Sequence, residues 1–158
     1  MSDIDKGEFR AVLGHFASGV VLVTGMDDGG PAGFTCQSFF SLSLDPPLIA
    51  LAPGKSSTSW PRVASTGSIC VNILAADQEG LARAFAKSGA DKFSGVGWSP
   101  AANGAPRLHG ALAWLDCRIR DVHDAGDHHL VVAHVVEMET GKGQPLLFYR
   151  GGFGNFTP

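Results

Sequence analysis

Apolar and polar residues alternate along several stretches of this chain, and a period-two pattern of this kind predicts β-strands. The pattern is clearest over residues 33–47, where Phe40, Leu42 and Leu44 fall on one face. We expect this face to enter a core, and a proline pair at the end of the stretch to stop regular pairing. The opposite face carries hydroxyl side chains: Thr35, Ser38, Ser41 and Ser43. It is either a wall for a flat polar ligand or an ordinary solvated strand face.

Further strands are predicted where β-branched and apolar residues form short runs bounded by turn residues. These runs cover residues 20–25, 48–52, 68–74, 111–120, 128–138 and 146–150. Residues 20–25 and the stretch that opens at residue 33 are expected to form a hairpin around a turn rich in Asp and Gly. Residues 89–110 show no clear period and are interpreted as a long ordered loop.

Helical spacing is found in three other segments. In residues 3–18, four apolar side chains fall at i, i+3, i+4 and i+7, which predicts an amphipathic helix that lies against a sheet. The stripe consists of Phe9, Val12, Leu13 and Phe16. A second helix is predicted from Ser56 or Ser57 to about Ser65, and a third from an Asp77 cap to about Ser88.

Six to seven strands in hairpin order with few helices indicate a mainly β protein, and an antiparallel barrel is the economical way to hide the sheet edges. The length of 158 residues predicts a single domain, residues 1–158, with a real hydrophobic core. Only 17% of the residues are charged, which is below the usual quarter and favours an oligomer.

Charge and cysteine usage narrow the class of partner. The net charge is −3 and no basic run occurs, which argues against nucleic acid or an anionic membrane as the main partner. Cys36, Cys70 and Cys117 are odd in number and widely spaced, so we interpret them as reduced core thiols. No signal pattern and no apolar run of about 20 residues is found, so a cytoplasmic protein with a small-molecule partner is expected.

Two short segments are candidates for binding chemistry. Lys55, Ser56 and Ser57 would surround the free amides of a helix start, which predicts an anion site; the alternative is an ordinary capped surface helix. His128 follows the tight turn at Gly126-Asp127, where an imidazole could face a cleft. The alternative there is a polar residue beside a turn that needs Asp and Gly for its own geometry.

A histidine-rich region raises the question of a metal site. It contains His123, Asp124, Asp127, His128, His129 and His134. Neighbouring residues on a strand face opposite sides, and six residues span roughly 20 Å, so the set cannot converge on one ion. A His123–His128 pair across the turn is the arrangement that stays open, and no metal is assigned. No glycine-rich dinucleotide loop and no Gly-x-Ser-x-Gly elbow occurs.

Taken together, several motifs in this order and spacing resemble the flavin reductase family, the short reductase components of two-component flavin monooxygenases. The motifs are Phe9-Arg10, Phe16-Ala17-Ser18-Gly19-Val20, residues 33–47, Lys55-Ser56-Ser57, Val71-Asn72-Ile73-Leu74, Asp77-Gln78, Leu81-Ala82, Lys92-Phe93, Ala113-Trp114-Leu115-Asp116-Cys117 and Gly126-Asp127-His128. The resemblance implies an FMN-binding, Greek-key split β-barrel with an N-terminal helix and two or three short peripheral helices.

The resemblance also implies a function and a set of site residues. NADH or NADPH would reduce FMN or FAD by hydride transfer, and a homodimer would supply the reduced flavin to a separate oxygenase. The implied flavin-contacting residues are Thr35, Cys36, Gln37, Ser38 and Ser41 at the ring, Lys55, Ser56 and Ser57 at the phosphate, and Lys92 and Phe93 nearby, the last two reaching toward a neighbouring subunit's site. His128 would act at the nicotinamide side.

One departure and two alternatives accompany this assignment. The family commonly carries small residues where this chain has Cys36 and Gln37, so Gln37 is expected to alter the contact at the ring edge. One alternative function is a non-catalytic flavin- or haem-binding split-barrel protein. The other is an oxygenase that keeps its flavin.

Overall fold

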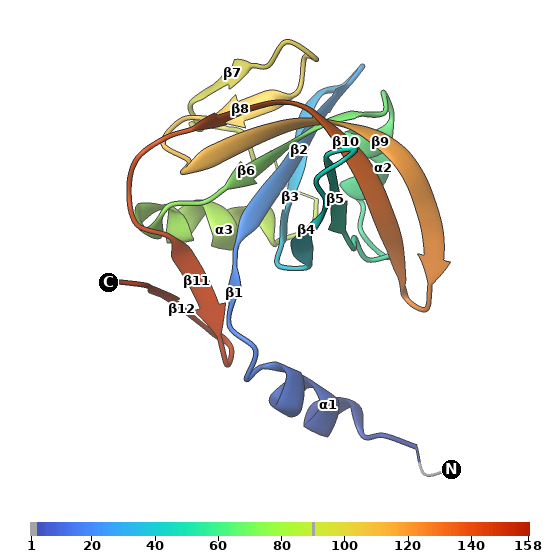
Figure 1. Cartoon of the computed structure of the whole chain (residues 1–158), viewed down its shortest axis with the longest axis vertical. Coiled ribbons are helices and arrows are strands. Elements are labelled where there is room, and N and C mark those ends of the chain that lie inside the picture. The colour runs from blue at the N-terminus through green and yellow to red at the C-terminus, as the bar shows by residue number, and fades with distance from the viewer. Residues whose placement is uncertain (1–2, 90) are drawn as a thin grey trace.

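A computed structural model describes residues 3–89 and 91–158. Within these residues the largest element is an antiparallel sheet that curls into a barrel (Figure 1). Its strands are β2 (Val21–Asp27), β3 (Gly30–Cys36), β4 (Phe39–Ser43), β5 (Leu48–Leu51), β6 (Ser68–Ile73), β9 (Ala113–Ala125) and β10 (His128–Thr140). They are hydrogen-bonded in the order β3-β2-β6-β9-β10-β5-β4. The predicted mainly β, antiparallel barrel is therefore confirmed.

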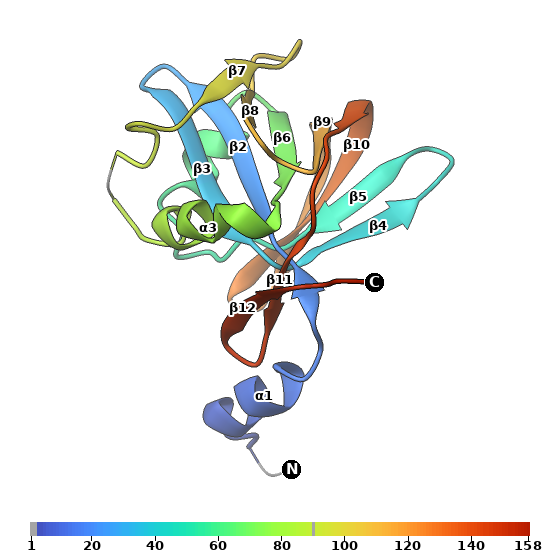
Figure 2. The same ribbon diagram turned by 90° about the vertical axis from the view of Figure 1, so that its left-hand side faces the viewer.

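The barrel has an open seam between its two edge strands. β3 and β4 lie at opposite edges of the sheet, although only Gln37 and Ser38 separate them in sequence. Ser38 fixes the crossing, because its hydroxyl donates to the carbonyl of Ala52 at 3.0 Å and accepts from the amide of Ala52 at 3.1 Å. Figure 2 shows the β4–β5 hairpin diverging from β2 and β3 on either side of this seam. The stretch at residues 33–47 is thus two strands joined at the seam, not one strand.

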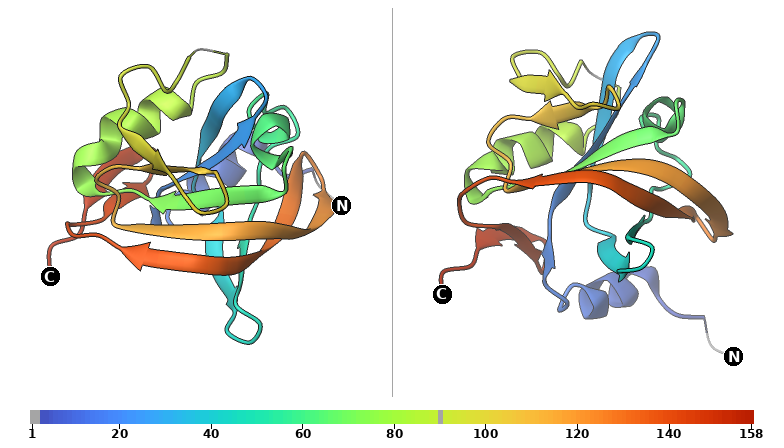
Figure 3. Two further views of the ribbon diagram at one scale, coloured as in Figure 1. Left: turned by 90° about the horizontal axis from the view of Figure 1, so that it is seen from above. Right: turned by 45° about the horizontal axis from the view of Figure 1, so that its top comes forward.

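The burial predicted for the second of these strands is wrong. Phe40, Leu42 and Leu44 are 50%, 46% and 92% exposed, whereas Phe39 on the other face packs against the barrel core. The period of two was correct, but a period alone does not tell which face of an edge strand meets the core. The β4–β5 hairpin projects from the barrel (Figure 3), so its apolar face is left uncovered.

The barrel interior holds the main hydrophobic cluster. It contains β-branched residues of β2, β6 and β10, among them Val23, Val71 and Val131, all completely buried. Helix α2 (Trp60–Ala64) packs against β2 and β3, where Trp60 meets Phe34 edge to face with ring centroids 6.1 Å apart. This packing fixes the position of the segment that leads into α2.

A second hydrophobic cluster lies outside the barrel, around helix α3 (Glu79–Phe85), which follows the 3₁₀ turn η1 (Ala76–Gln78). It involves two small sheets, one formed by β7 (Trp98–Pro100) and β8 (Pro106–Leu108), the other by β1 (Ser18–Gly19), β11 (Leu146–Tyr149) and β12 (Gly152–Asn155). The prediction of a loop over residues 89–110 therefore missed the β7–β8 hairpin, and β1 and β12 were also missed. β1, β7 and β8 have only two or three residues, and β12 is a Gly-Phe-Gly-Asn segment, so none of them displays a period.

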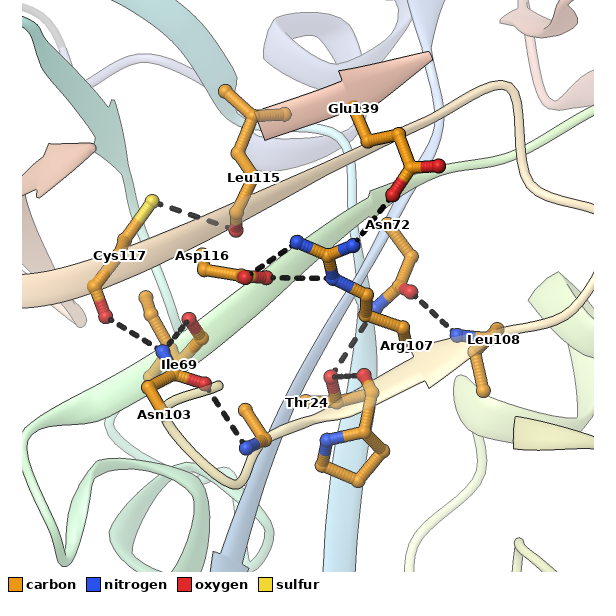
Figure 4. Close-up of polar contacts among 12 residues, drawn as sticks. Thr24, Ile69, Asn72, Asn103, Arg107, Leu108, Leu115, Asp116, Cys117 and Glu139 are labelled. Carbon is orange, nitrogen blue, oxygen red and sulfur yellow. Dashed lines mark hydrogen bonds and ion pairs between the residues drawn. The ribbon is translucent and has the colours of Figure 1, made fainter. Parts of the chain in front are cut away.

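Buried polar side chains fasten the β7–β8 hairpin to the main sheet (Figure 4). Arg107 of β8 forms a two-bonded ion pair with Asp116 of β9 and a third bond, of 2.8 Å, to Glu139 of β10. The buried amide of Asn72 accepts from the amide of Leu108 at 2.8 Å. The hairpin is therefore a fixed part of the fold.

Helix α1 (Lys6–Leu13) is shorter than predicted and does not lie against a sheet of its own chain. Its N-terminus is capped by Asp5, which accepts from the amide of Glu8 at 2.8 Å, and it ends at Gly14. None of its residues is buried: Phe9 in the helix is 53% exposed, and Phe16 just after the helix is 81% exposed. It extends from the barrel in Figures 1 and 2. Within the described residues, no helix is long and apolar enough to cross a membrane.

Candidate functional site

A groove follows β3 and consists of three adjoining chambers. The ring chamber, about 640 Å³, is lined by Leu13, Phe16, Ser18, Phe34, Thr35, Cys36, Gln37, Ser38, Ala52, Pro53, Gly54, Ala86 and His128. The hydroxyl chamber, about 250 Å³, is lined by Phe34, Thr35, Gly54, Ser56, Ser57, Thr58, Ser59, Phe85, Ala86, Lys87, Ser88 and Lys92. The outer chamber, about 270 Å³, is lined by Pro31, Ala32, Gly33, Thr58, Ser59, Arg62, Gly89, Asp91, Lys92 and Phe93. Neighbouring chambers share lining residues, so they lie side by side along β3.

The wall of the ring chamber is built at the barrel seam from short side chains held in place. The Thr35 hydroxyl donates to the carbonyl of Ala82 in α3 at 2.6 Å, and Ser38 is bonded to Ala52. Cys36 lies 3.1 Å from the Ser38 hydroxyl, and its burial raises the pKa of the thiol, which keeps it neutral. Gln37 is exposed at the chamber edge. Four of the five residues predicted at the ring therefore line one wall, and only Ser41, in β4, lies outside the three chambers.

The β9–β10 hairpin also contributes to the ring chamber, through His128 at the start of β10. The turn of this hairpin is joined to the chain at residues 53–55: the amide of Lys55 donates to the carbonyl of Asp127 and that of His129 to the carbonyl of Pro53, both at 2.9 Å. Gly54 and His128 form an isolated antiparallel bridge. His128 thus lines the ring chamber, and its role there stays a prediction.

The imidazole of His128 is oriented by its neighbour. Its Nδ1 lies 2.7 Å from a carboxylate oxygen of Asp127, and this bond lowers the pKa of Asp127. Because an ionised carboxylate can only accept, Nδ1 carries the proton of the bond, and Nε2 is left beside Gly54. In the β9–β10 register His123 lies opposite Leu130, so the His123–His128 pair considered for a metal is not directly across the turn.

The predicted anion residues do not stand at a helix start. Helix α2 begins at Trp60, not at Ser56 or Ser57, because Pro61 suits a first helical turn and residues 54–57 form a separate turn. Ser56 and Ser57 line the hydroxyl chamber, and Ser57 accepts from the amide of Trp60 at 3.1 Å. The Lys55 side chain instead forms an ion pair with Asp124 and lines none of the three chambers.

Lys92 and Phe93 lie at the far end of the groove. The Lys92 ammonium donates to the carbonyls of Gly33 and Phe85, both at 3.2 Å, and to the hydroxyl of Ser59 at 3.0 Å, and partial burial lowers its pKa. The Phe93 ring packs edge to face on Phe85 with centroids 4.9 Å apart. Phe93 thus lines the outer chamber from the second hydrophobic cluster.

Sequence reasoning missed several lining residues of the groove. Thr58 and Ser59 continue the polar run that begins at Lys55, so the run itself could have included them. Gly54 lines two chambers because it has no side chain, and Leu13 and Phe16 were assigned to a helix stripe rather than to a site. Ala86 carries no chemical signal at all. These residues come together only through the tertiary fold.

The fold and the groove define a class: an antiparallel split barrel whose seam provides a flat wall that leads into a pocket of hydroxyl groups. The sequence matches the family described as flavin reductase like domain over residues 13–157, and the chain belongs to this family. It is 46% identical over 158 residues to a flavin reductase of Pseudomonas putida, an alignment that covers 99% of this chain and 93% of the relative. The resemblance inferred from sequence motifs is therefore confirmed.

Two solved structures place the fold in the same group. Nitrilotriacetate monooxygenase component B of Mycobacterium thermoresistibile has a TM-score of 0.94 and 44% identity, covering 98% of this chain and 88% of that one. The NADH:FAD oxidoreductase of Streptomyces globisporus, solved with NAD and FAD fragments, has a TM-score of 0.92 and 34% identity, covering 99% and 98% of the two chains. Both similarities extend over nearly the whole barrel.

Proposed function

We propose that this chain is an NAD(P)H-dependent flavin reductase that transfers hydride from NADH or NADPH to FMN or FAD. The observation that carries the proposal is the ring chamber, walled by short side chains and lined by His128, with the hydroxyl chamber directly beside it. The ring chamber, at about 640 Å³, is of a size usual for cofactor and small-molecule sites. The Pseudomonas relative is named a flavin reductase, which supports the proposal.

The groove fits a flavin on its own features. Cys36 and Ser38 are short, and Gly54 has no side chain, so a planar ring system can approach the backbone closely. The neighbouring hydroxyl chamber offers polar groups where a phosphate would follow. Thr35, Cys36, Gln37 and Ser38 would hold the ring, and Ser56 and Ser57 the phosphate.

The protein's part in the reaction is positioning. A bound flavin supplies an electron-accepting ring that takes up the hydride of a reduced nicotinamide. The bonds of Thr35 and Ser38 to the backbone hold the ring wall in one arrangement before any ligand enters, which lowers the cost of alignment. Asp127 fixes the imidazole of His128, which would contact the nicotinamide side from the open face of the chamber.

The test of this function is an anaerobic assay with NADH or NADPH in the presence of FMN or FAD. The flavin absorbance near its visible maximum is expected to bleach, and nicotinamide oxidation in air is expected to require added flavin. A protein that binds flavin but leaves it oxidised would support the alternative of a non-catalytic flavin-binding split barrel and overturn the proposal.

The variant His128→Ala is expected to slow flavin reduction about tenfold, because the nicotinamide loses its contact at the open face of the chamber. Flavin affinity should change little, since the ring wall is untouched. Stopped-flow absorbance measures the reduction step, and His123→Ala, an exposed histidine of the same hairpin, is the matched control. An unchanged reduction rate in His128→Ala would remove this residue from the mechanism.

We also propose that the reduced flavin passes to a separate oxygenase and that the protein acts in the cytoplasm. The Mycobacterium relative is described as a component of a monooxygenase, which supports the division into two proteins. The three cysteines are free and buried, as suits a reducing compartment. The partner oxygenase can be identified by measuring turnover of candidate oxygenases. In each assay, this protein and NADH are the only source of reduced flavin.

A homodimer is the third part of the proposal. The apolar stripe of α1 and the apolar face of β4 are both uncovered in the single chain, and a second copy would bury them. Because Leu13 at the end of α1 and Phe16 just after it line the ring chamber, dimerisation would also complete the wall of the site.

The variant Val12→Glu/Leu44→Glu is expected to convert a dimer into a monomer, because it places carboxylates on both uncovered apolar faces. Light scattering after size-exclusion chromatography gives the mass directly. Gln144→Glu, which adds a single carboxylate at an exposed polar position, should leave the wild-type mass unchanged. A wild-type protein with the mass of one chain would contradict the proposed dimer.

A further inference from the structure

The end of the β9–β10 hairpin is held in place without buried side chains of its own. Regular pairing between β5 and β10 stops at Leu51 and Val131. Residues 122–130, here called the hairpin end, include no buried residue, and the side chains of Asp124 and Asp127 are 82% and 97% exposed. The order of this part of the molecule therefore depends on hydrogen bonds and charges rather than on apolar packing.

The segment Pro53–Lys55 joins the hairpin end to the rest of the barrel. The amide of His129 donates to the carbonyl of Pro53, and the amide of Lys55 donates to the carbonyl of Asp127. These two backbone bonds lie on either side of His128. They hold the start of β10 and the turn before it, but they do not reach β9.

The side chain of Lys55 adds the contact to β9. Its ammonium forms an ion pair with Asp124, and the bond from Lys55 lowers the pKa of this carboxyl group, which keeps it ionised at neutral pH. Lys55 thus contacts the turn through its amide and β9 through its ammonium. Because these two contacts lie on different strands of the hairpin, its end cannot rotate about the backbone bonds without breaking the ion pair.

Asp127 connects this attachment to the imidazole of His128. Its carbonyl accepts from the amide of Lys55, and its carboxylate accepts from Nδ1 of His128 at 2.7 Å. A shift of the hairpin end relative to Lys55 would therefore move the carboxylate and the imidazole together. His128 lines the ring chamber, whereas Lys55 and Asp124 line none of the three chambers. The ion pair can consequently act on a ligand only through His128.

The exposure of the ion pair decides which property of the protein it affects. Surface ion pairs contribute little to the stability of a whole domain, because water screens the charges and both side chains lose conformational freedom. The rate of a hydride transfer, in contrast, is sensitive to displacements of about 1 Å in the groups that align the reactants. The pair of Lys55 and Asp124 is therefore suited to control a rate rather than folding.

We propose that the Lys55–Asp124 ion pair positions the imidazole of His128 for hydride transfer from the nicotinamide. Lys55 and Asp124 are then positioning residues, and neither contacts the flavin. The inference rests on the proposed function, in which His128 acts at the nicotinamide side. It gives Lys55 a role different from the phosphate contact implied by the sequence resemblance.

The experiment measures the limiting rate of FMN reduction by NADH in stopped flow, together with the dissociation constant of FMN. Lys55→Met and Asp124→Asn are each expected to lower the rate about fivefold and to leave the dissociation constant unchanged. Lys55→Arg should retain most of the rate, and the exchanged pair Lys55→Glu/Asp124→Lys should recover most of it. Lys142→Met, at an exposed lysine that lines none of the three chambers, is the matched control. Thermal denaturation should show nearly the wild-type melting temperature for all of these variants.

A double variant tests whether the ion pair acts through His128. If His128→Ala lowers the rate about tenfold, Lys55→Met/His128→Ala should also lower it about tenfold, whereas independent contributions would multiply to about fiftyfold. A merely structural role of the ion pair would not produce this loss of additivity in a folded protein.

The outcomes separate this inference from the function on which it rests. Weaker FMN binding in Lys55→Met would show a phosphate contact and overturn the inference. An unchanged rate in Asp124→Asn, or two losses that multiply in the double variant, would overturn it as well, while the wild-type protein still reduces flavin. If Lys55→Met does not fold, Asp124→Asn and its combination with His128→Ala decide. A wild-type protein that leaves FMN oxidised in the presence of NADH would defeat the proposed function itself.

Discussion

Replacing Gly54 with leucine is expected to lower kcat/KM for flavin reduction by on the order of 100-fold, because the new side chain would occupy the groove at the junction of two chambers. Gly54 lines both the ring chamber and the hydroxyl chamber. A Cβ at this position would lie 3.8 Å from Nε2 of His128 and 3.9 Å from the Ser56 hydroxyl, which is ordinary contact. A methyl group therefore fits, whereas the longer leucine side chain must extend into the path of the ligand.

The matched control for this prediction is Gly54→Ala. It should fold normally and lose less than tenfold, since its methyl group makes only van der Waals contact and Gly54 is not among the glycines with positive φ. Steady-state rates with NADH and FMN measure the effect, and thermal denaturation checks that both variants are folded. If the leucine variant keeps its activity within tenfold of wild type while folded, the ligand does not pass through this junction.

The sequence predicted the type of fold more securely than the location of its exposed surfaces. Hairpin order and β-branched runs were sufficient for the antiparallel barrel, because both are local features that the tertiary structure did not override. Burial at Phe40 and Leu44 was predicted wrongly for a reason that applies to any edge strand. The apolar face of an edge strand can pack against the core of its own chain or against another molecule. The alternation of apolar and polar residues is the same in both cases, so it does not tell them apart.

The site was predicted in part because its residues are contiguous in sequence at the places where the barrel brings strands together. Thr35 to Ser38 cross the seam, and His128 begins β10, so two short segments supply several lining residues of the ring chamber. The role of Lys55 could not be judged in this way. Whether its ammonium faces the chamber or a carboxylate depends on how the fold places the β9–β10 hairpin, in which Asp124 forms an ion pair with Lys55.

The contacts of Lys92, like those of Lys55, could not be predicted from the sequence. Lys92 was expected near the flavin only through the resemblance to the flavin reductase family, because residues 89–110 carry no period from which a contact could be derived. The structure places it where β3, α3 and the start of α2 converge, with one hydrogen bond to each. A contact that joins three separate elements is a property of the assembled fold and leaves no trace in any one segment.

The largest effect on stability is expected from Asp116→Ala, at about 3–5 kcal/mol of unfolding free energy, because it leaves a largely buried guanidinium without its carboxylate. The Asp116 side chain is 1% exposed and that of Arg107 is 20% exposed. Two bonds, of 3.1 Å from Nε and 2.6 Å from Nη2 of Arg107, join them in the network of Figure 4. At about 2–4 °C per kcal/mol, the melting temperature should fall by roughly 6–20 °C.

Variants of this network can distinguish the cost of leaving a buried charge unpaired from the net contribution of the ion pair to stability. Glu139 is 64% exposed, so Glu139→Gln should cost about 1 kcal/mol or less even though its bond to Arg107 is 2.8 Å long. The double variant Arg107→Met/Asp116→Leu should recover much of the stability lost in Asp116→Ala, since no buried charge is then unpaired. Thermal denaturation of the three variants at one protein concentration tests these expectations.

The position of the network also predicts what Asp116→Ala should leave intact. Neither Arg107 nor Asp116 lines any of the three chambers, and the β8–β9 contact lies outside the groove along β3. Flavin affinity and the rate of flavin reduction, measured well below the lowered melting temperature, should therefore stay within about twofold of wild type. A loss of activity in folded Asp116→Ala would mean that the β7–β8 hairpin holds the groove in shape, because the hairpin packs on the same hydrophobic cluster as Phe93 and α3. The two measurements together decide whether this ion pair supports the fold alone or also the site.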